Sequence, residues 1–275
     1  DMQTMGDGDF VIGYDLTDIA PRYIQEVLDG KTVRDVYIDS SGAPVMVAGS
    51  LVDIGSGIQW AMISKQNLEE ALSNASGDGN EDFFAKYIQE YGYYDLFLIN
   101  AEGKAFYTVA KEADYQTNFF NGEYADSNLG QLVQKVDQTG KYAMADFAPY
   151  APSDNEPCAF IAQPLMHNGD TELIVALQIS LDAINAIMQQ RAGMGETGET
   201  YLVGKDKLMR SDSFLDPEDH SVAASFADPS QGRVDTVAVD KALAGESGAE
   251  VITDYTGSQV LSAYAPVQVG EHTWA

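Results

Sequence analysis

The sequence predicts an α+β fold in which antiparallel sheets are flanked by helices, and three observations lead to it. Residues 93–115 hold two β-forming runs around the turn Ala101–Lys104, which is the pattern of a hairpin. Three later runs are also rich in β-formers and are bounded by Gly, Pro, Asn or Asp. A helix with apolar residues at helical spacing then begins at Leu181. The three runs are Lys141–Ala148, Cys158–Met166 and Leu173–Ser180.

The N-terminal stretch predicts a helix followed by a small sheet. Thr17 or Asp18 can cap a helix that runs to about Leu28, with Pro21 near its first turn and Gly30 ending it. Turn residues then separate short β-forming runs. Strands are expected at Phe10–Tyr14, Val36–Asp39, Pro44–Val52 and Ile58–Ser64.

The segment between this sheet and the hairpin predicts two helices. They are expected at Gln66–Leu72 and Glu81–Tyr91, with the Gly-containing stretch Ser76–Asn80 between them. The second carries an apolar stripe that favours packing against the sheet or a partner helix. After the hairpin, Asp114–Asp126 is an aromatic loop and Ser127–Val136 a further helix.

The N-terminal half-module recurs at the C-terminal end of the chain when 215 is added to each residue number. Ten identical residues occur in order over about 35 positions, from Leu28 and Leu243 to Trp60 and Trp274, with a one-residue gap before the tryptophan. Each matched glycine ends a helix or turns a hairpin, so the match has a physical reason.

This repeat and the composition define three modules. Residues 1–75 are expected to form a partial module that repeats over 241–275, residues 80–192 a complete module, and residues 193–275 a third. The third module stops in the middle of the strand that the first copy completes. Either a further unit precedes the first copy, or units have been cut and joined.

Charge restricts the class of partner. The chain has 43 acidic and 15 basic residues, for a net charge of −28. Such a field repels nucleic acids and anionic membrane surfaces. Two interpretations stay open: a highly solvated surface, or a field that attracts cationic ligands.

The cysteine count and the hydropathy restrict the class of protein further. Cys158 is the only cysteine, so no internal disulfide can form, and its apolar strand context indicates a buried structural thiol. No run approaches the ~20 apolar residues that cross a bilayer. The chain begins Asp-Met-Gln-Thr without the basic start of a signal peptide.

The catalytic and cofactor motifs in the sequence lack the context that their chemistry requires. Gly193-x-Gly195-x-x-Gly198 follows a helix and opens a strand expected at Glu199–Val203, the reverse of a dinucleotide site, so it is interpreted as a linker. Ser211 and Ser213 have no histidine partner, which argues against an enzyme. No metal or cofactor site is expected, because three scattered histidines lack ligand spacing and four acidic residues favour turn caps. These residues are His167, His220, His272, Asp212, Asp216, Glu218 and Asp219.

The order of elements and three phrases resemble the extracytoplasmic Cache domain of bacterial receptors, which is PAS-like. The phrases are YGYYDLFLINAEG (91–103), DFAPYAPSDNEPCAFIAQPL (146–165) and GETGETYLVGKDKLMRSDS (195–213). Together they cover roughly residues 80–275 and are similar to the double Cache type of methyl-accepting chemotaxis proteins. The resemblance implies a membrane-distal type module at 80–192 that holds the ligand and a membrane-proximal type module at 193–275.

The resemblance also implies function and location. We expect the periplasmic or extracellular sensor region of a bacterial inner-membrane chemoreceptor that binds a small molecule, signals by conformational change and is a homodimer through its helices. Its membrane segments would lie outside this sequence. A histidine kinase or nucleotide cyclase sensor stays open, as does, less favourably, a free periplasmic solute-binding protein.

The expected ligand pocket is lined by the second hairpin strand, the aromatic loop and the central strands. Asp146 could receive an amine and Lys111 a carboxylate. The Arg-x-Trp-Tyr element of amino-acid-sensing relatives is replaced by Lys111–Tyr115, and the aspartate of their last strand by Gln178, so another small polar metabolite is expected. The candidate residues are Tyr107, Lys111, Asp114, Tyr115, Asp146, Phe147, Tyr150, Phe160 and Gln178.

Overall fold

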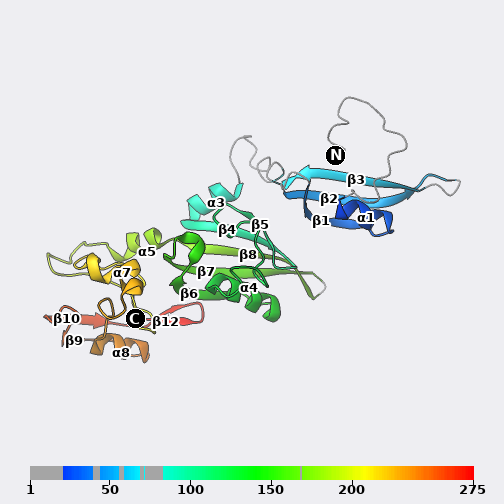
Figure 1. Cartoon of the computed structure of the whole chain (residues 1–275). Helices are drawn as coiled ribbons and strands as arrows, with labels where there is room; N and C mark the ends of the chain where they lie inside the picture. The colour runs from blue at the N-terminus through cyan, green and yellow to red at the C-terminus, as the bar shows by residue number, and fades with distance from the viewer. Residues whose placement is uncertain (1–20, 40–43, 56–58, 69–70, 72–82, 168) are drawn as a thin grey trace. The chain divides into compact units, whose positions relative to one another are not determined.

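The structure is a computed structural model that describes residues 21–39, 44–55, 59–68, 71, 83–167 and 169–275. The chain folds as two compact units, Asp1–Lys86 and Tyr87–Ala275. Both combine helices with antiparallel sheets, which confirms the expected α+β class (Figure 1). In the part of the chain that is described, no helix is long and apolar enough to cross a membrane.

The first unit is one helix on a three-stranded antiparallel sheet. Helix α1 (Arg22–Leu28) covers one face of β1 (Val33–Ile38), β2 (Pro44–Asp53) and β3 (Gln59–Asn67), which lie in that order. Its core is formed by alternate residues of the strands, as the two-residue period of a half-buried sheet requires. The buried residues are Tyr23, Val27, Val33, Val45 and Val47.

One expectation for this region needs correction, and others concern residues that the structure does not describe. Strand β3 continues through Gln66 and Asn67, so the helix expected to begin at Gln66 begins later. The strand ladder with β2 extends to these residues and outweighs their local helical pattern. The expected strand Phe10–Tyr14 and the start of the first helix at Thr17 or Asp18 lie outside the described residues.

Helix α3 (Phe83–Tyr91) contains the boundary between the units, and a five-stranded antiparallel sheet follows it in the second unit. The strand order is β5-β4-β8-β7-β6, so the hairpin lies at one edge and β6 at the other. A 3-10 turn at Ala151–Ser153 joins β6 to β7, and α5 (Leu181–Met188) follows β8. The strands are β4 (Tyr93–Asn100), β5 (Ala105–Thr108), β6 (Ala143–Pro149), β7 (Pro157–His167) and β8 (Asp170–Ile179).

Helix α4 (Asn128–Thr139) and the loop before it cover one face of this sheet (Figure 1). Ser127 caps the helix by accepting the N–H of Gly130, and Gly140 ends it in the left-handed conformation. Four apolar helix residues pack against Phe97, Phe119 and Phe160. We call this side of the sheet the α4 face. The helix residues are Leu129, Leu132, Val133 and Val136.

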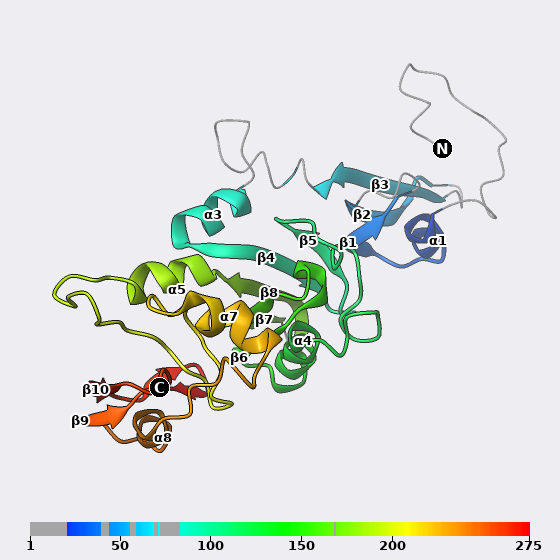
Figure 2. The same ribbon diagram turned by 60° about the vertical axis from the view of Figure 1, so that its left-hand side comes forward.

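The opposite face of the sheet packs against the C-terminal part of the chain. Met144, Phe147 and Ala159 of the sheet share a core with Val203, Met209, Val222 and Trp274. Strand β6 is the part of the sheet nearest to the last hairpin in both Figure 1 and Figure 2. The C-terminal elements are α6 (Pro217–His220), α7 (Val222–Ala227), α8 (Val237–Leu243), β9 (Gly248–Thr253), β10 (Gln259–Tyr264), β11 (Val267–Val269) and β12 (His272–Trp274).

The strand expected at Glu199–Val203 does not form. Val203 makes only an isolated bridge to Met209 and exchanges both backbone hydrogen bonds with Ala275. Leu202 bonds instead to the loop that follows, because its N–H donates to the Ser211 hydroxyl and its carbonyl accepts the Arg210 N–H.

The repeat seen in the sequence is present in the structure down to strand register. Adding 215 to the bounds of α1 and β1 gives those of α8 and β9. Val36 pairs with Met46, as Val251 pairs with Leu261. With the one-residue gap, Val52 pairs with Trp60 as Val267 pairs with Trp274. The two stretches therefore form the same helix and the same successive hairpins.

Candidate functional site

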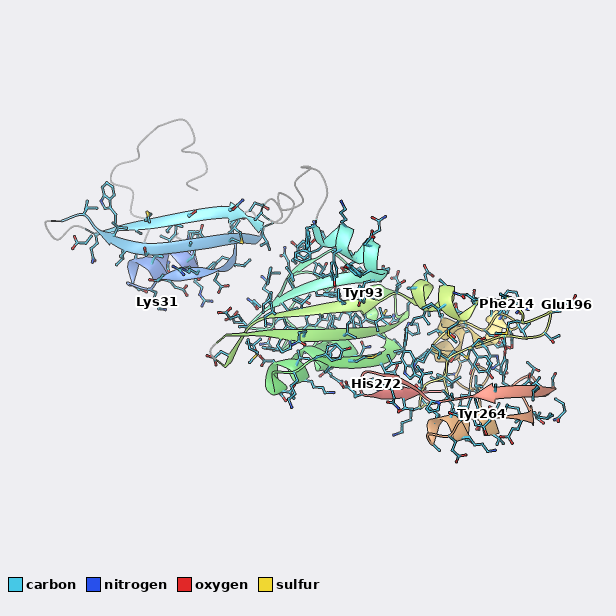
Figure 3. The ribbon with its side chains drawn as sticks, turned by 180° about the vertical axis from the view of Figure 1, so that it is seen from behind. Lys31, Tyr93, Glu196, Phe214, Tyr264 and His272 are labelled. Atoms are coloured by element: carbon cyan, nitrogen blue, oxygen red, sulfur yellow. The ribbon has the colours of Figure 1, made fainter. Side chains whose placement is uncertain are left out.

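The α4 face carries a cluster of buried polar side chains at the end of the sheet where β4 begins and β8 ends. Figure 3 labels Tyr93, the first residue of β4. Asp95 of β4 pairs with Gln178 of β8, which in turn pairs with Phe160 of β7. Asp114, from the aromatic loop, joins them. Asp95, Asp114 and Gln178 are each at least nine-tenths buried, and we call them the acceptor cluster.

Asp95 has one satisfied and one unsatisfied carboxylate oxygen. Its Oδ1 accepts the N–H groups of Leu96, Val109 and Ala110 at 2.7, 2.8 and 3.0 Å, which fixes the chain as it leaves β5. Its Oδ2 is buried and has no hydrogen-bond partner. Burial, together with the nearby Asp114 charge, raises the pKa of Asp95 to about 7 against the lowering effect of the three N–H groups.

Asp114 repeats this pattern with a side-chain donor. The hydroxyl of Tyr150 donates to Oδ2 at 2.6 Å, whereas Oδ1 is buried without a partner. Burial raises the pKa of Asp114 to about 6, although the Tyr150 hydrogen bond lowers it. Tyr150 is itself fully buried and packs edge-to-face on Phe160, with ring centroids 4.9 Å apart.

Gln178 supplies the third unsatisfied acceptor. Its Nε2 donates to the sulfur of Cys158 at 3.1 Å and reaches the hydroxyl of Ser153 at 3.5 Å, while its Oε1 is buried without a partner. Burial raises the pKa of the Cys158 thiol to about 11, so this group stays protonated. The thiol is structural, as the sequence predicts, but it forms part of the wall of the cluster.

Glu112 lies beside the cluster, and both of its carboxylate oxygens accept hydrogen bonds. Oε1 accepts from the Tyr94 hydroxyl and Oε2 from the Ser153 hydroxyl, each at 2.7 Å. The first of these bonds, with burial, raises the pKa of Tyr94 to about 12. Glu112 therefore adds negative charge beside Asp114 without offering it a donor.

The chemistry of the cluster is that of an acceptor site that lacks its donor. Three buried oxygens face no hydrogen, and buried polar atoms in native proteins are nearly always paired. Within the described residues, no lysine or arginine forms an ion pair with Asp95 or Asp114. A group with several N–H donors and a positive charge would satisfy the oxygens and stabilise both carboxylates.

Four of the nine residues predicted from the sequence lie together here: Asp114, Tyr150, Phe160 and Gln178. Sequence reasoning missed Asp95, Glu112 and Ser153. Asp95 had a usable signal, because an aspartate inside the apolar run 93–100 is unfavourable in a strand without a specific role.

Three predicted residues lie elsewhere in the module. Tyr107 pairs with Leu98, so it lies on the face opposite Phe97 and the cluster. Lys111 is exposed, has a left-handed backbone (φ 53°) and donates its N–H to the Thr108 hydroxyl. Tyr115 is half-buried in the turn after Glu112, and its N–H donates to the Glu112 carbonyl.

Asp146 and Phe147 contact the C-terminal part of the chain and not the other expected pocket residues. The Asp146 carboxylate accepts two N–H groups of Arg210 at 2.8 and 2.9 Å, in a bidentate pair with a buried guanidinium. Phe147 packs on Trp274, with ring centroids 6.1 Å apart. A register shift in β6 after Ala145 turns this stretch toward the C-terminal part.

The C-terminal part has its own polar network around Tyr255. Glu199 accepts from the hydroxyls of Tyr255 and Ser213, and His220 stacks on Tyr255 with centroids 4.2 Å apart. The His220 Nδ1 lies 2.8 Å from Asp216. Asp212 accepts the N–H of Val222 at the start of α7, whereas Asp216 makes no side-chain cap for α6. Among the described residues, no group of three or more His, Cys, Asp or Glu could hold a metal ion.

No family model matches the chain, and no curated protein matches it. The solved structures similar to it include the ligand-binding domain of the Pseudomonas fluorescens chemoreceptor CtaA with L-isoleucine. The identity is 12%, each chain is covered over 67%, and the TM-score is 0.42. The Pseudomonas aeruginosa PAO1 amino-acid chemoreceptor PctC with GABA matches at 14% identity over 75% of this chain and 85% of that one, with a TM-score of 0.41.

A third similar structure is the extracellular domain of mmHK1S-Z2, assigned as a histidine kinase. It is 18% identical over 69% of this chain and 76% of its own, with a TM-score of 0.41.

Proposed function

We propose that this chain is the extracytoplasmic ligand-sensing region of a bacterial chemoreceptor and that it binds a small molecule through a protonated amine at the acceptor cluster. The observation that carries the proposal is the set of three buried oxygens without donors on Asp95, Asp114 and Gln178. A primary ammonium has three N–H donors and a positive charge, so it matches the number of acceptors and is opposite in sign to the two carboxylates.

The negative charge that an ammonium requires comes from residues next to Gln178. A neutral amide at the end of β8 cannot hold an ammonium by itself. Asp95 lies opposite it on β4, and Asp114 adds a second carboxylate from the loop. The negative charge therefore comes from the neighbouring strand and the loop. The net charge of −28 favours the approach of a cation as well.

A connected set of contacts gives the signal a route out of the cluster. The Asn128 side chain donates to the backbone carbonyls of Asp146 and Cys158, so the start of α4 is fixed to β6 and β7 beside the cluster. Asp146 in turn holds Arg210 of the C-terminal part. A ligand that binds one arrangement of these contacts better than another shifts their population. In the receptor we propose, helix α3 pairs with its twin in a homodimer.

The test is a thermal-shift screen with matched ligands. Each amine is compared with the alcohol of the same shape, such as putrescine with 1,4-butanediol, beside amino acids, organic acids and purines. A ligand that binds only the folded chain raises the melting temperature by mass action. We expect amines to stabilise the chain and their alcohols to have no effect.

Variants assign the hit to the cluster. Asp114→Asn removes a charge-assisted bond and is expected to weaken amine binding at least tenfold. Asp154→Asn is the control, because it neutralises an exposed carboxylate at a left-handed position that asparagine tolerates. Equal affinity in the two variants, or binding of organic acids alone, contradicts the proposal, and turnover of any compound contradicts a sensor.

The same ligand site is compatible with two other types of receptor. A histidine kinase or a nucleotide cyclase would use the same extracytoplasmic region, so the proposed ligand chemistry applies to them equally. A free periplasmic solute-binding protein is less favoured, because the elements follow the order of the receptor sensors that the sequence resembles.

A further inference from the structure

The first unit exposes an apolar patch at the tip of its β2–β3 hairpin. Trp60 and Met62 are each 64% exposed, and Val52 and Ile54 lie beside them and are also exposed. Trp60 pairs with Val52 and Met62 with Ser50, so these side chains share the sheet face opposite α1. We call Val52, Ile54, Trp60 and Met62 the hairpin-tip patch.

The second copy of the repeat shows what this tip packs against. Trp274, the equivalent of Trp60, is only 3% exposed because it packs on Phe147 of β6. Val269, the equivalent of Ile54, belongs to the same core. The copies share their strand register, so the difference between the two tryptophans comes from the partner and not from the hairpin.

The glycine at the turn gives an independent comparison. Gly55 and Gly270 are equivalent, and both have positive φ, 90° and 58°. A side chain added at Gly270 would meet the Met144 side chain at 3.1 Å, whereas nothing lies within 4 Å at Gly55. His272, labelled in Figure 3, also contacts the Met144 carbonyl through Nε2 at 3.2 Å. In the second copy, the turn as well as the tryptophan is seated on β6.

We infer that the hairpin-tip patch docks on a second five-stranded module, like that of residues 93–179, which the same polypeptide supplies ahead of the first copy. In the second unit, β6 of residues 93–179 is covered by the β11–β12 hairpin. In the second copy the five-stranded module comes before the helix and hairpins along the chain. The same order places the missing module before α1.

Cysteine protection tests this inference. Met62→Cys puts a reactive thiol in the patch, and Leu261→Cys is the matched control, because Leu261 is 78% exposed at the position equivalent to Met46. The native Cys158 is buried with a raised pKa and adds no background. Maleimide labelling rates are measured on the 275-residue chain and on the complete extracytoplasmic polypeptide that the gene encodes.

We expect both thiols to react rapidly in the 275-residue chain, and the Met62→Cys thiol to be protected at least tenfold in the complete polypeptide. Adding Trp60→Asp should restore rapid labelling, while the Leu261→Cys control stays unchanged throughout. Equal rates for Met62→Cys in both proteins would overturn the inference. Protection that grows with concentration of the 275-residue chain alone would assign the patch to a second copy, and a gene that encodes no such module would equally overturn it.

Discussion

At the scale of single residues, the acceptor cluster holds two buried carboxylates whose negative charges repel each other. Asp95 and Asp114 are fully buried, close enough for their charges to interact, and each keeps one oxygen without a donor. An ionised carboxylate in such a position is unfavourable unless a cation or a proton compensates it. The ligand-free protein therefore takes up protons here at a pH where exposed aspartates have lost theirs.

This predicts an unusual pH dependence of stability. The folded-state pKa values of about 7 for Asp95 and about 6 for Asp114 lie above the 3.8 of an ordinary aspartate. Folding is then favoured by protonation, and this stability is lost as pH rises from about 4 to about 7, by up to about 1.4 kcal/mol per unit for each group. Urea unfolding at pH 5 and pH 7.5 measures the effect.

The variant that isolates it is Asp95→Asn, which is neutral at every pH. We expect the difference in unfolding free energy between pH 5 and pH 7.5 to shrink in this variant and to stay unchanged in Asp154→Asn. A saturating amine should also reduce the difference in the native chain, because it stabilises the ionised carboxylates. If Asp95→Asn shows the native slope, Asp95 does not titrate in this range.

At the scale of elements, α4 depends on its first turn. Ser127 caps it, and the helix buries four apolar residues against the sheet. Ser127→Ala is expected to lower the free energy of unfolding by about 1 kcal/mol. The measurement is urea unfolding followed by Trp274 fluorescence in a Trp60→Phe background.

The control for this prediction is Ser180→Ala, which removes the cap of α5. That helix buries none of its residues, so its fraying should change the same transition less. Equal losses in the two variants would mean that the cap of α4 has no special role in holding the covered face of the sheet.

Elements with a clear period were predictable from the sequence, and those set by distant contacts were not. The hairpin, the three later strands and α5 follow local patterns of apolar residues and turns, and so does the repeat. The end of β3 at Asn67 could not be predicted from the sequence, because pairing with β2 decides it. The fate of Glu199–Val203 depends on Ala275, 72 positions beyond Val203.

The candidate site divides in the same way. The sequence placed Asp114, Tyr150, Phe160 and Gln178 on one face, and the structure brings these four together. Asp146 and Phe147 were misplaced, because a register shift in β6 reverses the side from which they are read. Asp95 was overlooked because its neighbours are apolar, although that context is what makes a carboxylate there informative.

At the scale of the whole second unit, the Arg210–Asp146 pair joins the ligand module to the C-terminal part. Arg210 is buried and also bonds to Asp206, whereas Asp146 is partly open to solvent. Asp146→Ala leaves a buried cation with one exposed partner, and we expect a loss of about 3 kcal/mol. Arg210→Met leaves a carboxylate that water can reach, so the loss should be smaller.

Chemical unfolding of both variants tests this asymmetry. Lys135→Ala is the control, because it removes an exposed ion pair with Glu271 and should change stability by less than about 1 kcal/mol. Equal losses in Asp146→Ala and Arg210→Met would show that the attraction between the charges, and not the stranding of a buried cation, governs the contact.

The shared register of the two copies has a consequence for biosynthesis. A newly made chain contains two β1-type strands of six residues each, and each pairs with its following strand in the same register over six residues. Crosswise pairing between copies is thus open to a chain that refolds from denaturant, and repeat proteins misassemble by this route. Emergence from the ribosome in order lets the N-terminal hairpin close before its duplicate exists, so vectorial synthesis protects a chain whose own sequence offers the wrong partner.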